Sequence, residues 1–180
     1  MTATPEEIIN FWRAAGPKKW WRKDEDFDAA IATRFCDTHK AARKGTLDHW
    51  ADEPNAMLAL ILVLDQFTRN LHRNSADAFA QDAKGLSLAK RAVAKGHDAK
   101  MPEDLRSFCY LPFMHSEELA DQETCIALME AHGGEDNIKA AREHRDIIAK
   151  FGRFPHRNPV LGRAMTDEEQ AFLDDGGFKG

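Results

Sequence analysis

The longest apolar run in the chain covers the nine residues from Ala56 to Leu64 and follows Pro54 closely. A bilayer-spanning helix needs about 20 apolar residues, so this run is too short to cross a membrane. Met, Leu and Ala dominate the run and β-branched residues are few, which favours a helix over a strand. Because such a helix is apolar on every side, we expect it to lie at the centre of the fold, covered by other helices.

Helix start signals recur along the chain, whereas strand signals are nearly absent. Capping boxes open helices at Thr4 and Thr166, and Asp24 is the expected N-cap of a helix that Gly45 ends. Pro112 is expected to break or kink the chain. We predict about eight helices, which start near Pro5, Asp24, Pro54, Ser75, Pro102, Pro112, Asn137 and Thr166.

Short connections between consecutive helices predict antiparallel neighbours. The fold class is therefore all-α, with the helices stacked as hairpins in a solenoid or a compact bundle. No linker or composition shift divides residues 1–180, so we expect a single α-helical domain. A chain of this length buries enough surface to need no disulfide or metal for stability.

Composition narrows the classes of function. The net charge of −5 argues against a general nucleic-acid coat, and no run is apolar enough for a membrane anchor. Three scattered cysteines and the absence of a leader indicate a cytoplasmic protein with free thiols. No phosphate-binding loop or zinc signature is present, so we predict no metal and no cofactor. The sequence leaves the oligomeric state open.

Three stretches hold more polar and aromatic side chains than helix packing requires, at residues 64–73, 110–122 and 144–158. The third overlaps a segment, residues 139–163, in which seven basic residues meet two acidic ones. Arginine predominates there, and its planar guanidinium group suits two-point capture of a carboxylate or phosphate. The competing interpretation is that these arginines pair with acidic side chains of neighbouring helices, for example Asp65 or Glu118.

Histidines in the second and third stretches are candidates for acid–base chemistry, because imidazole titrates near neutral pH. His115 and His144 are the main candidates, with Glu117 beside them and His156 as a further one. A divalent metal held by Asp65, His115, Glu118 and Asp121 is an alternative that the sequence leaves open.

The three stretches resemble the bacterial domain of unknown function called DUF924. The resemblance rests on Leu64 to Asn70, Tyr110 to Glu117 and His144 to Asn158, and the opening Ile8 to Trp12 and the pair Trp20-Trp21 also fit. One departure is Thr68, where the family pattern has proline. The resemblance implies a tetratricopeptide-like, right-handed helical fold and supplies no mechanism.

Carried over from the motifs, the residues of a ligand-binding site would be Asp65, Gln66, Arg69, Asn70, His115, Glu117, Arg145, Arg153, His156, Arg157 and Asn158.

Three functions follow as hypotheses. The first is a groove that binds a small anionic molecule or an acidic peptide, in which Arg145, Arg153 and Arg157 hold the anion, Phe154 stacks on it, and Asp65 and Glu117 orient the arginines. The second is a hydrolase or lyase with His115 or His144 as base and arginines as anion stabilisers. The third is a scaffold that binds another protein on a helical surface. The sequence alone does not decide whether the chain is an enzyme.

Overall fold

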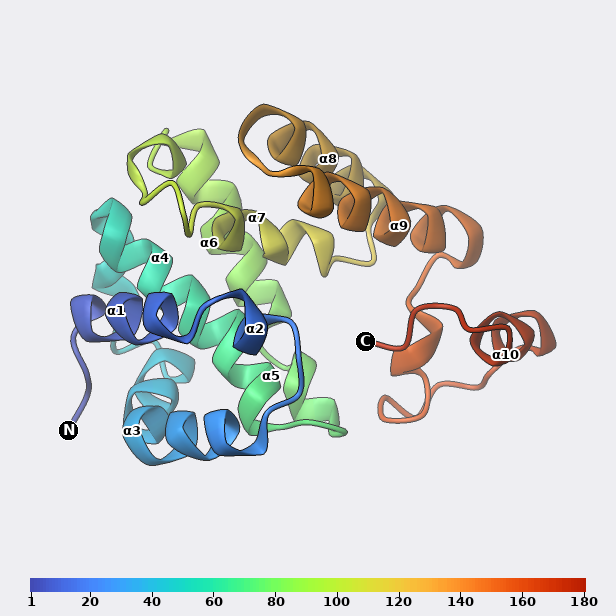
Figure 1. Ribbon diagram of the computed structural model, residues 1–180, viewed down its shortest axis with the longest axis horizontal. Helices are drawn as coiled ribbons and strands as arrows, with labels where there is room; N and C mark the ends of the chain where they lie inside the picture. Colours follow the sequence, from blue (N-terminus) through green and yellow to red (C-terminus); the bar gives the residue numbers. More distant parts are fainter.

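The computed structural model describes residues 1–180 and is all-α, as the sequence predicts. Figure 1 shows α8 and α9 as a hairpin at one end of a helical body, with the chain after α9 forming a lobe beside it. The α-helices are α1 (Pro5–Ala15), α2 (Pro17–Trp20), α3 (Glu25–Arg43), α4 (Pro54–Leu62), α5 (Thr68–Leu71), α6 (Asp82–Ala94), α7 (Ser107–Met114), α8 (Leu119–His132), α9 (Glu135–Phe151) and α10 (Asp167–Asp174). Shorter segments are the 3₁₀ turns η1 (Asp48–Asp52), η3 (Ala76–Phe79), η4 (Asp98–Lys100) and η5 (Pro155–Arg157), and the π-helical η2 (Val63–Phe67). No helix is both long enough and apolar enough to span a membrane.

Helix α4 lies at the centre, as its composition predicts. All six residues from Met57 to Leu62 are fully buried, and α1, α6 and α7 pack around them. An aromatic cluster extends this core, with Trp12 stacked edge-to-face on Phe108 and tilted against Phe27 and Phe67. The core holds 33 buried apolar residues and reaches from α1 to the first buried position of α9.

The predicted N-terminal caps form at three helices. The Thr4 and Thr166 capping boxes close on Glu7 and Glu169, and the Asp24 carboxylate accepts a hydrogen bond from the Phe27 amide. Each cap satisfies an amide that the helix itself leaves without a partner. Local chemistry is sufficient here to set the start of the helix.

Other predicted boundaries are wrong. Ser75 caps only the 3₁₀ turn η3, and α6 begins later, at Asp82. Pro102 opens a turn instead of a helix, and α7 begins at Ser107. Helix α9 begins two residues before Asn137, with Gly134 as its N-cap. The short helix α2, at the Gly16-Pro17 break, is additional.

Pro112 does not end its helix. It lies inside α7, which continues to Met114. Proline in this position removes one backbone hydrogen bond, and burial compensates for the loss because Pro112 and its neighbours from Phe108 to Met114 are all buried. His115 is the C-cap of α7, and the extended residue Glu118 precedes α8.

A small apolar cluster joins the C-terminal segment, residues 152–180, to the end of α9. Ile147 and Ile148 of α9 pack with Phe154, and Phe151 and Phe172 cover them. Gly152 ends α9 with φ +67, a left-handed conformation that glycine adopts without strain. This turn sends the chain back across the end of α7, where the polar stretches meet.

Candidate functional site

The first polar stretch lies in a local irregularity of the central helix. Between α4 and α5 the backbone forms the π-helical turn η2, a geometry that often accompanies functional sites. The hydroxyl of Thr68 donates to the Val63 carbonyl and bonds the ring of His39 on α3 at 2.9 Å. The turn buries the polar side chains of Asp65 and Gln66. Thr68 thus ties this turn to α3.

Asp65 is the buried centre of a polar cluster. Its carboxylate accepts hydrogen bonds from His115 Nδ1 at 2.7 Å, from Arg69 at 3.0 Å and from the Gln66 amide. Burial by itself would raise the pKa of Asp65, but the charge of Arg69 and the contact with His115 outweigh it and lower the pKa far below its usual range. Asp65 is therefore a fixed negative charge inside the protein.

A second carboxylate, Asp82, joins the two nearby arginines. Arg69 bonds it at 3.1 Å and Arg157 bonds it at 3.3 Å, so Asp82 is shared between the first and third polar stretches. Asp82 is the first residue of α6, and Gly85 one turn later packs against Asp65 and the Pro112 ring. We call Asp65, Arg69, Asp82, His115 and Arg157 the arginine cluster.

Arg157 is unusually buried for an arginine, with 6% of its surface exposed. Its guanidinium carbon lies 4.5 Å from the ring centres of both Phe79 and Phe154, and one of its nitrogens donates to the His115 carbonyl at 3.0 Å. Burial lowers the pKa of Arg157 to about 10. Its Nε is buried and has no hydrogen-bond partner.

His115 has one nitrogen engaged and the other free. Because Nδ1 bonds the Asp65 carboxylate, Nδ1 carries the proton and Nε2 has the lone pair. Burial and the charge of Arg69 lower the pKa of His115, against the opposing effect of Asp65, so the ring is neutral at pH 7. Nothing in the protein hydrogen-bonds Nε2, and 16% of the side chain remains exposed.

A salt bridge holds Phe154 against Arg157. Glu117 pairs with Arg163 through two bonds of 2.7 and 3.0 Å and also accepts the Phe154 amide at 2.8 Å. Arg163 in turn donates to the Phe154 carbonyl and to Asn158. We call this pair the Glu117–Arg163 latch, because it joins the α7–α8 connection to the C-terminal segment.

Four rings pack beside Arg157, and we call them the ring cluster: His144, Phe154, His156 and Phe178. Phe178 lies 4.5 Å from the His144 ring and 5.1 Å from the His156 ring, measured between centres. Phe154 touches both histidines from within the fold. Burial lowers the pKa of His144 to about 4 and that of His156 to about 3, so both rings are neutral at pH 7.

The remaining predicted residues lie apart from the arginine cluster. Arg145 pairs with Glu123 and Asp146, and Arg153 pairs with Glu169 on α10 and lowers the pKa of that carboxyl to about 2. Asn70 donates to Asp28 on α3, and Asn158 bonds Arg163 and the Met165 sulfur. The contacts with Glu123, Glu169 and Asp28 join separate elements, whereas the Arg145–Asp146 bond lies within α9 and the Asn158 bonds lie within the C-terminal segment.

Charge pairing extends over the whole basic segment. Its seven basic residues, Lys139, Arg142, Arg145, Lys150, Arg153, Arg157 and Arg163, each pair with a carboxylate. Neither Asp65 nor Glu118 is the partner of any of them. The local excess of positive charge in the sequence is therefore compensated in space.

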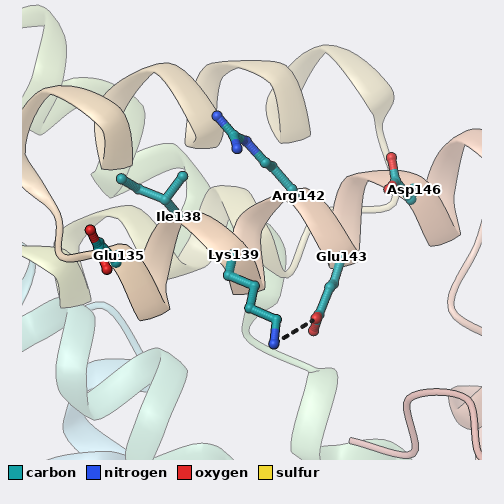
Figure 2. Close-up of a pocket in the computed structure, with 6 residues that line it drawn as sticks. All are labelled: Glu135, Ile138, Lys139, Arg142, Glu143 and Asp146. Carbon is teal, nitrogen blue, oxygen red and sulfur yellow. Dashed lines mark ion pairs between the residues drawn. The ribbon is translucent and has the colours of Figure 1, made fainter.

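A shallow charged pocket lies on the outer face of α9, away from the arginine cluster. Figure 2 shows Lys139 and Glu143 turned toward one another there, while Arg142 points the other way. No group of three or more His, Cys, Asp or Glu side chains is arranged to hold a metal ion. Of the four residues proposed as metal ligands, only Asp65 and His115 have side chains that bond each other, and the Asp121 carboxylate pairs with Lys90 instead.

Three residues of the arginine cluster and its surroundings are absent from the sequence-based prediction: Phe79, Asp82 and Arg163. Phe79 and Asp82 lie outside the three polar stretches, in what the sequence presents as an ordinary helix. Arg163 belongs to the basic segment but follows the third stretch by five residues. The one signal in the sequence that points to Asp82 is the need for a carboxylate to balance the charges of Arg69 and Arg157.

Comparison with known proteins places almost the whole chain in one group. The sequence model of DUF924, described as a bacterial protein of unknown function, matches residues 8–177. A solved structure, that of the protein of unknown function ATU0120 from Agrobacterium tumefaciens, is similar with 45% identity and a TM-score of 0.92. The match covers 96% of this chain and 97% of that one. None of the curated proteins compared with the chain matches it.

Proposed function

Since the chain belongs to the DUF924 family, whose description assigns no activity, we propose from the geometry that it binds a small molecule carrying a carboxylate or phosphate group. The ligand lies at the arginine cluster, where Arg69 and Arg157 meet. Those two residues come from the first and third polar stretches, and His115 from the second joins them.

The observation that carries the proposal is the unpaired Nε of buried Arg157. Leaving a buried charged donor without a partner costs at least about 1–3 kcal/mol, so such a group calls for an explanation. Each arginine has five N–H donors. Arg69 makes three hydrogen bonds within the protein and Arg157 makes two. An incoming oxyanion would take up donors that the protein leaves unused.

The burial of Arg157 favours a small ligand over an acidic peptide. The Arg157 side chain is 8% exposed and the Arg69 side chain 21%, so an extended chain has little of either to touch. The net charge of the arginine cluster is zero when His115 is neutral. Binding therefore depends on directed hydrogen bonds from fixed guanidinium groups, and long-range attraction contributes little.

Calorimetry with a panel of small carboxylates and phosphates tests the proposal. Arg157→Gln should weaken binding of any hit by about ten- to hundredfold, the loss expected for charge-assisted hydrogen bonds. Arg145→Gln is the matched control, because Arg145 is ion-paired but distant from the cluster, and it should bind as the parent does. Equal loss in both variants, or a panel without any hit, would refute the proposal.

A second candidate function rests on the Asp65–His115 pair. A carboxylate that fixes the tautomer of a neutral histidine and leaves Nε2 free creates a general base beside two guanidinium groups. Hydrolysis of p-nitrophenyl phosphate and p-nitrophenyl acetate is the direct assay. Turnover that His115→Gln abolishes would establish catalysis, and turnover that survives this change would exclude His115 as the base.

A further inference from the structure

The ring cluster contains a side chain that the protein holds only weakly. Phe178 is 38% exposed, and around it the backbone makes few bonds: Gly176 and Gly177 donate back to α10. Its ring lies against two neutral histidine rings, His144 and His156. An exposed phenylalanine seated between two imidazoles, after two consecutive glycines, is easily displaced.

The place that Phe178 occupies adjoins the proposed anion site. Phe154 contacts the rings of His144 and His156 and also stacks on the Arg157 guanidinium. Two buried nitrogens without partners lie on consecutive residues here, His156 Nδ1 and Arg157 Nε. The ring cluster and the arginine cluster thus share Phe154 as a common wall, and both present polar groups that the protein leaves unsatisfied.

We propose that His144, Phe154 and His156 form a ring subsite of the same binding site, that Phe178 fills it in the free protein, and that the ligand is an aromatic or otherwise planar anion whose ring replaces Phe178. This inference rests on the proposed function, because the anionic group of the ligand must bind Arg157. A planar ring gains offset or edge-to-face contacts with the imidazoles and with Phe154. The unpartnered His156 Nδ1 offers a hydrogen bond to a polar ring substituent.

Competition by Phe178 has a measurable consequence. When a side chain of the protein occupies the subsite, the apparent affinity falls by the fraction of molecules in which the subsite is free. An aromatic pair of this kind corresponds to roughly a two- to tenfold effect. Removing the Phe178 ring should therefore strengthen binding of a ring-bearing anion and leave binding of a bare anion unchanged.

The experiment compares phenyl phosphate with inorganic phosphate, by calorimetry, on the full chain and on Phe178→Ala. We expect phenyl phosphate to bind Phe178→Ala more tightly than the parent by roughly two- to tenfold, and inorganic phosphate to bind both alike. Lys179→Ala is the matched control, since Lys179 is a neighbouring exposed residue with no ion pair, and it should behave as the parent. Far-UV circular dichroism and a thermal melt verify that each variant is folded.

The failures of the two proposals are distinguishable. If Arg157→Gln abolishes binding of phenyl phosphate but Phe178→Ala leaves it unchanged or weakens it, the anion site stands and the ring subsite is wrong. If Phe178→Ala strengthens binding of both probes equally, Phe178 blocks access without marking a ring site, which also refutes the inference. If neither probe binds the parent or Phe178→Ala, the proposed function fails, and the inference fails with it.

Discussion

The helical body and the C-terminal segment are stabilised in different ways. The body buries 33 apolar residues in one continuous core, whereas the C-terminal segment adds only Phe154 to a buried cluster of three, whose other members are Ile147 and Ile148 of α9. Besides that small apolar contact, the two regions are joined by polar bonds: the Glu117–Arg163 latch and the bonds from Arg157 to Asp82 and to the His115 carbonyl. Apolar burial is non-directional and cooperative, while ion pairs and hydrogen bonds depend on geometry and solvent.

The difference bears on where a ligand would bind. A site inside the body would have to disturb close packing, which is costly. At the polar junction, by contrast, a ligand can replace hydrogen bonds and ion pairs of the protein with hydrogen bonds and ion pairs of its own. We therefore expect the C-terminal segment to open locally at a lower free energy than the body unfolds, as loosely packed parts of proteins do.

The largest predicted effect tests the body. Trp12 is 1% exposed and contacts four aromatic rings, so Trp12→Ala should lower the free energy of unfolding by about 3–5 kcal/mol. Chemical denaturation followed by circular dichroism measures this. If hydrogen exchange showed that only residues 152–180 lose protection in this variant, the division between the two regions would be wrong.

The second largest predicted effect is a loss of stability at low pH, mainly in the C-terminal segment. The folded pKa values of His144 and His156, about 4 and about 3, lie below the ordinary value of 6.5, so the opened segment binds more protons than the closed one. Stability is then lost as the pH falls from about 6.5 toward 4, by about 1.4 kcal/mol per pH unit for each histidine. Residues 152–180 should lose hydrogen-exchange protection, corrected for intrinsic rates, before the body does.

The body has a matching internal control. Burial and the nearby His72 and Arg43 lower the pKa of His39 on α3 to about 4 as well. Protonation of His39 therefore destabilises the body over the same pH range. The body has this one histidine and a large apolar core, so it should lose a smaller share of its stability than the C-terminal segment does. A uniform loss of protection over the whole chain would contradict the predicted order of opening.

Breaking the latch should have a smaller, local effect. Glu117→Gln removes the charge that Arg163 pairs with and weakens the bond to the Phe154 amide, at a cost of about 1.5–3 kcal/mol for charge-assisted bonds. Limited proteolysis within residues 152–180 should accelerate while the main thermal transition moves little. Glu123→Gln, which breaks the more exposed pair with Arg145, serves as the control and should leave proteolysis unchanged.

The sequence predicted best where local chemistry decides the structure. Thr4, Asp24 and Thr166 cap their helices as predicted, because the cap depends only on a hydrogen bond between a side chain and the amide three residues later. The apolar run from Ala56 to Leu64 also identified the central helix, because a segment that is apolar on every side has to be buried wherever it lies in the fold. Pro112 was misjudged because its tolerance in α7 depends on burial by other elements.

The site was predicted in part. Asp65, Arg69, His115 and Arg157 were all singled out from the sequence, and they are in mutual contact or share Asp82. The π-helical turn that buries Asp65 has no sequence signature that periodicity can detect. Asp82 was missed because its role depends on how α6 packs beside Arg69 and Arg157, and no sequence pattern within α6 indicates that packing.

The smallest predicted effect compares two glycines, one from each region. Gly85 is helical, and a Cβ there would meet its nearest neighbours at 3.9–4.0 Å, which is ordinary contact. Gly85→Ala should therefore stabilise the body by about 0.4–1 kcal/mol, because the unfolded chain loses freedom. Gly152 has φ +67 and open space around it, so Gly152→Ala should cost about 1–2 kcal/mol through backbone strain alone.

The two regions should respond to these glycine changes in different measurements. The gain from Gly85→Ala should appear in the main unfolding transition, since α6 packs directly on α4 and α7. The loss from Gly152→Ala should appear as faster hydrogen exchange in residues 152–180, with the main transition nearly unchanged, because the turn only sets the direction in which the segment leaves α9. If Gly152→Ala lowered the main transition as much as a core substitution does, the C-terminal segment would be part of the body's cooperative unit, and a site at the junction could not open independently.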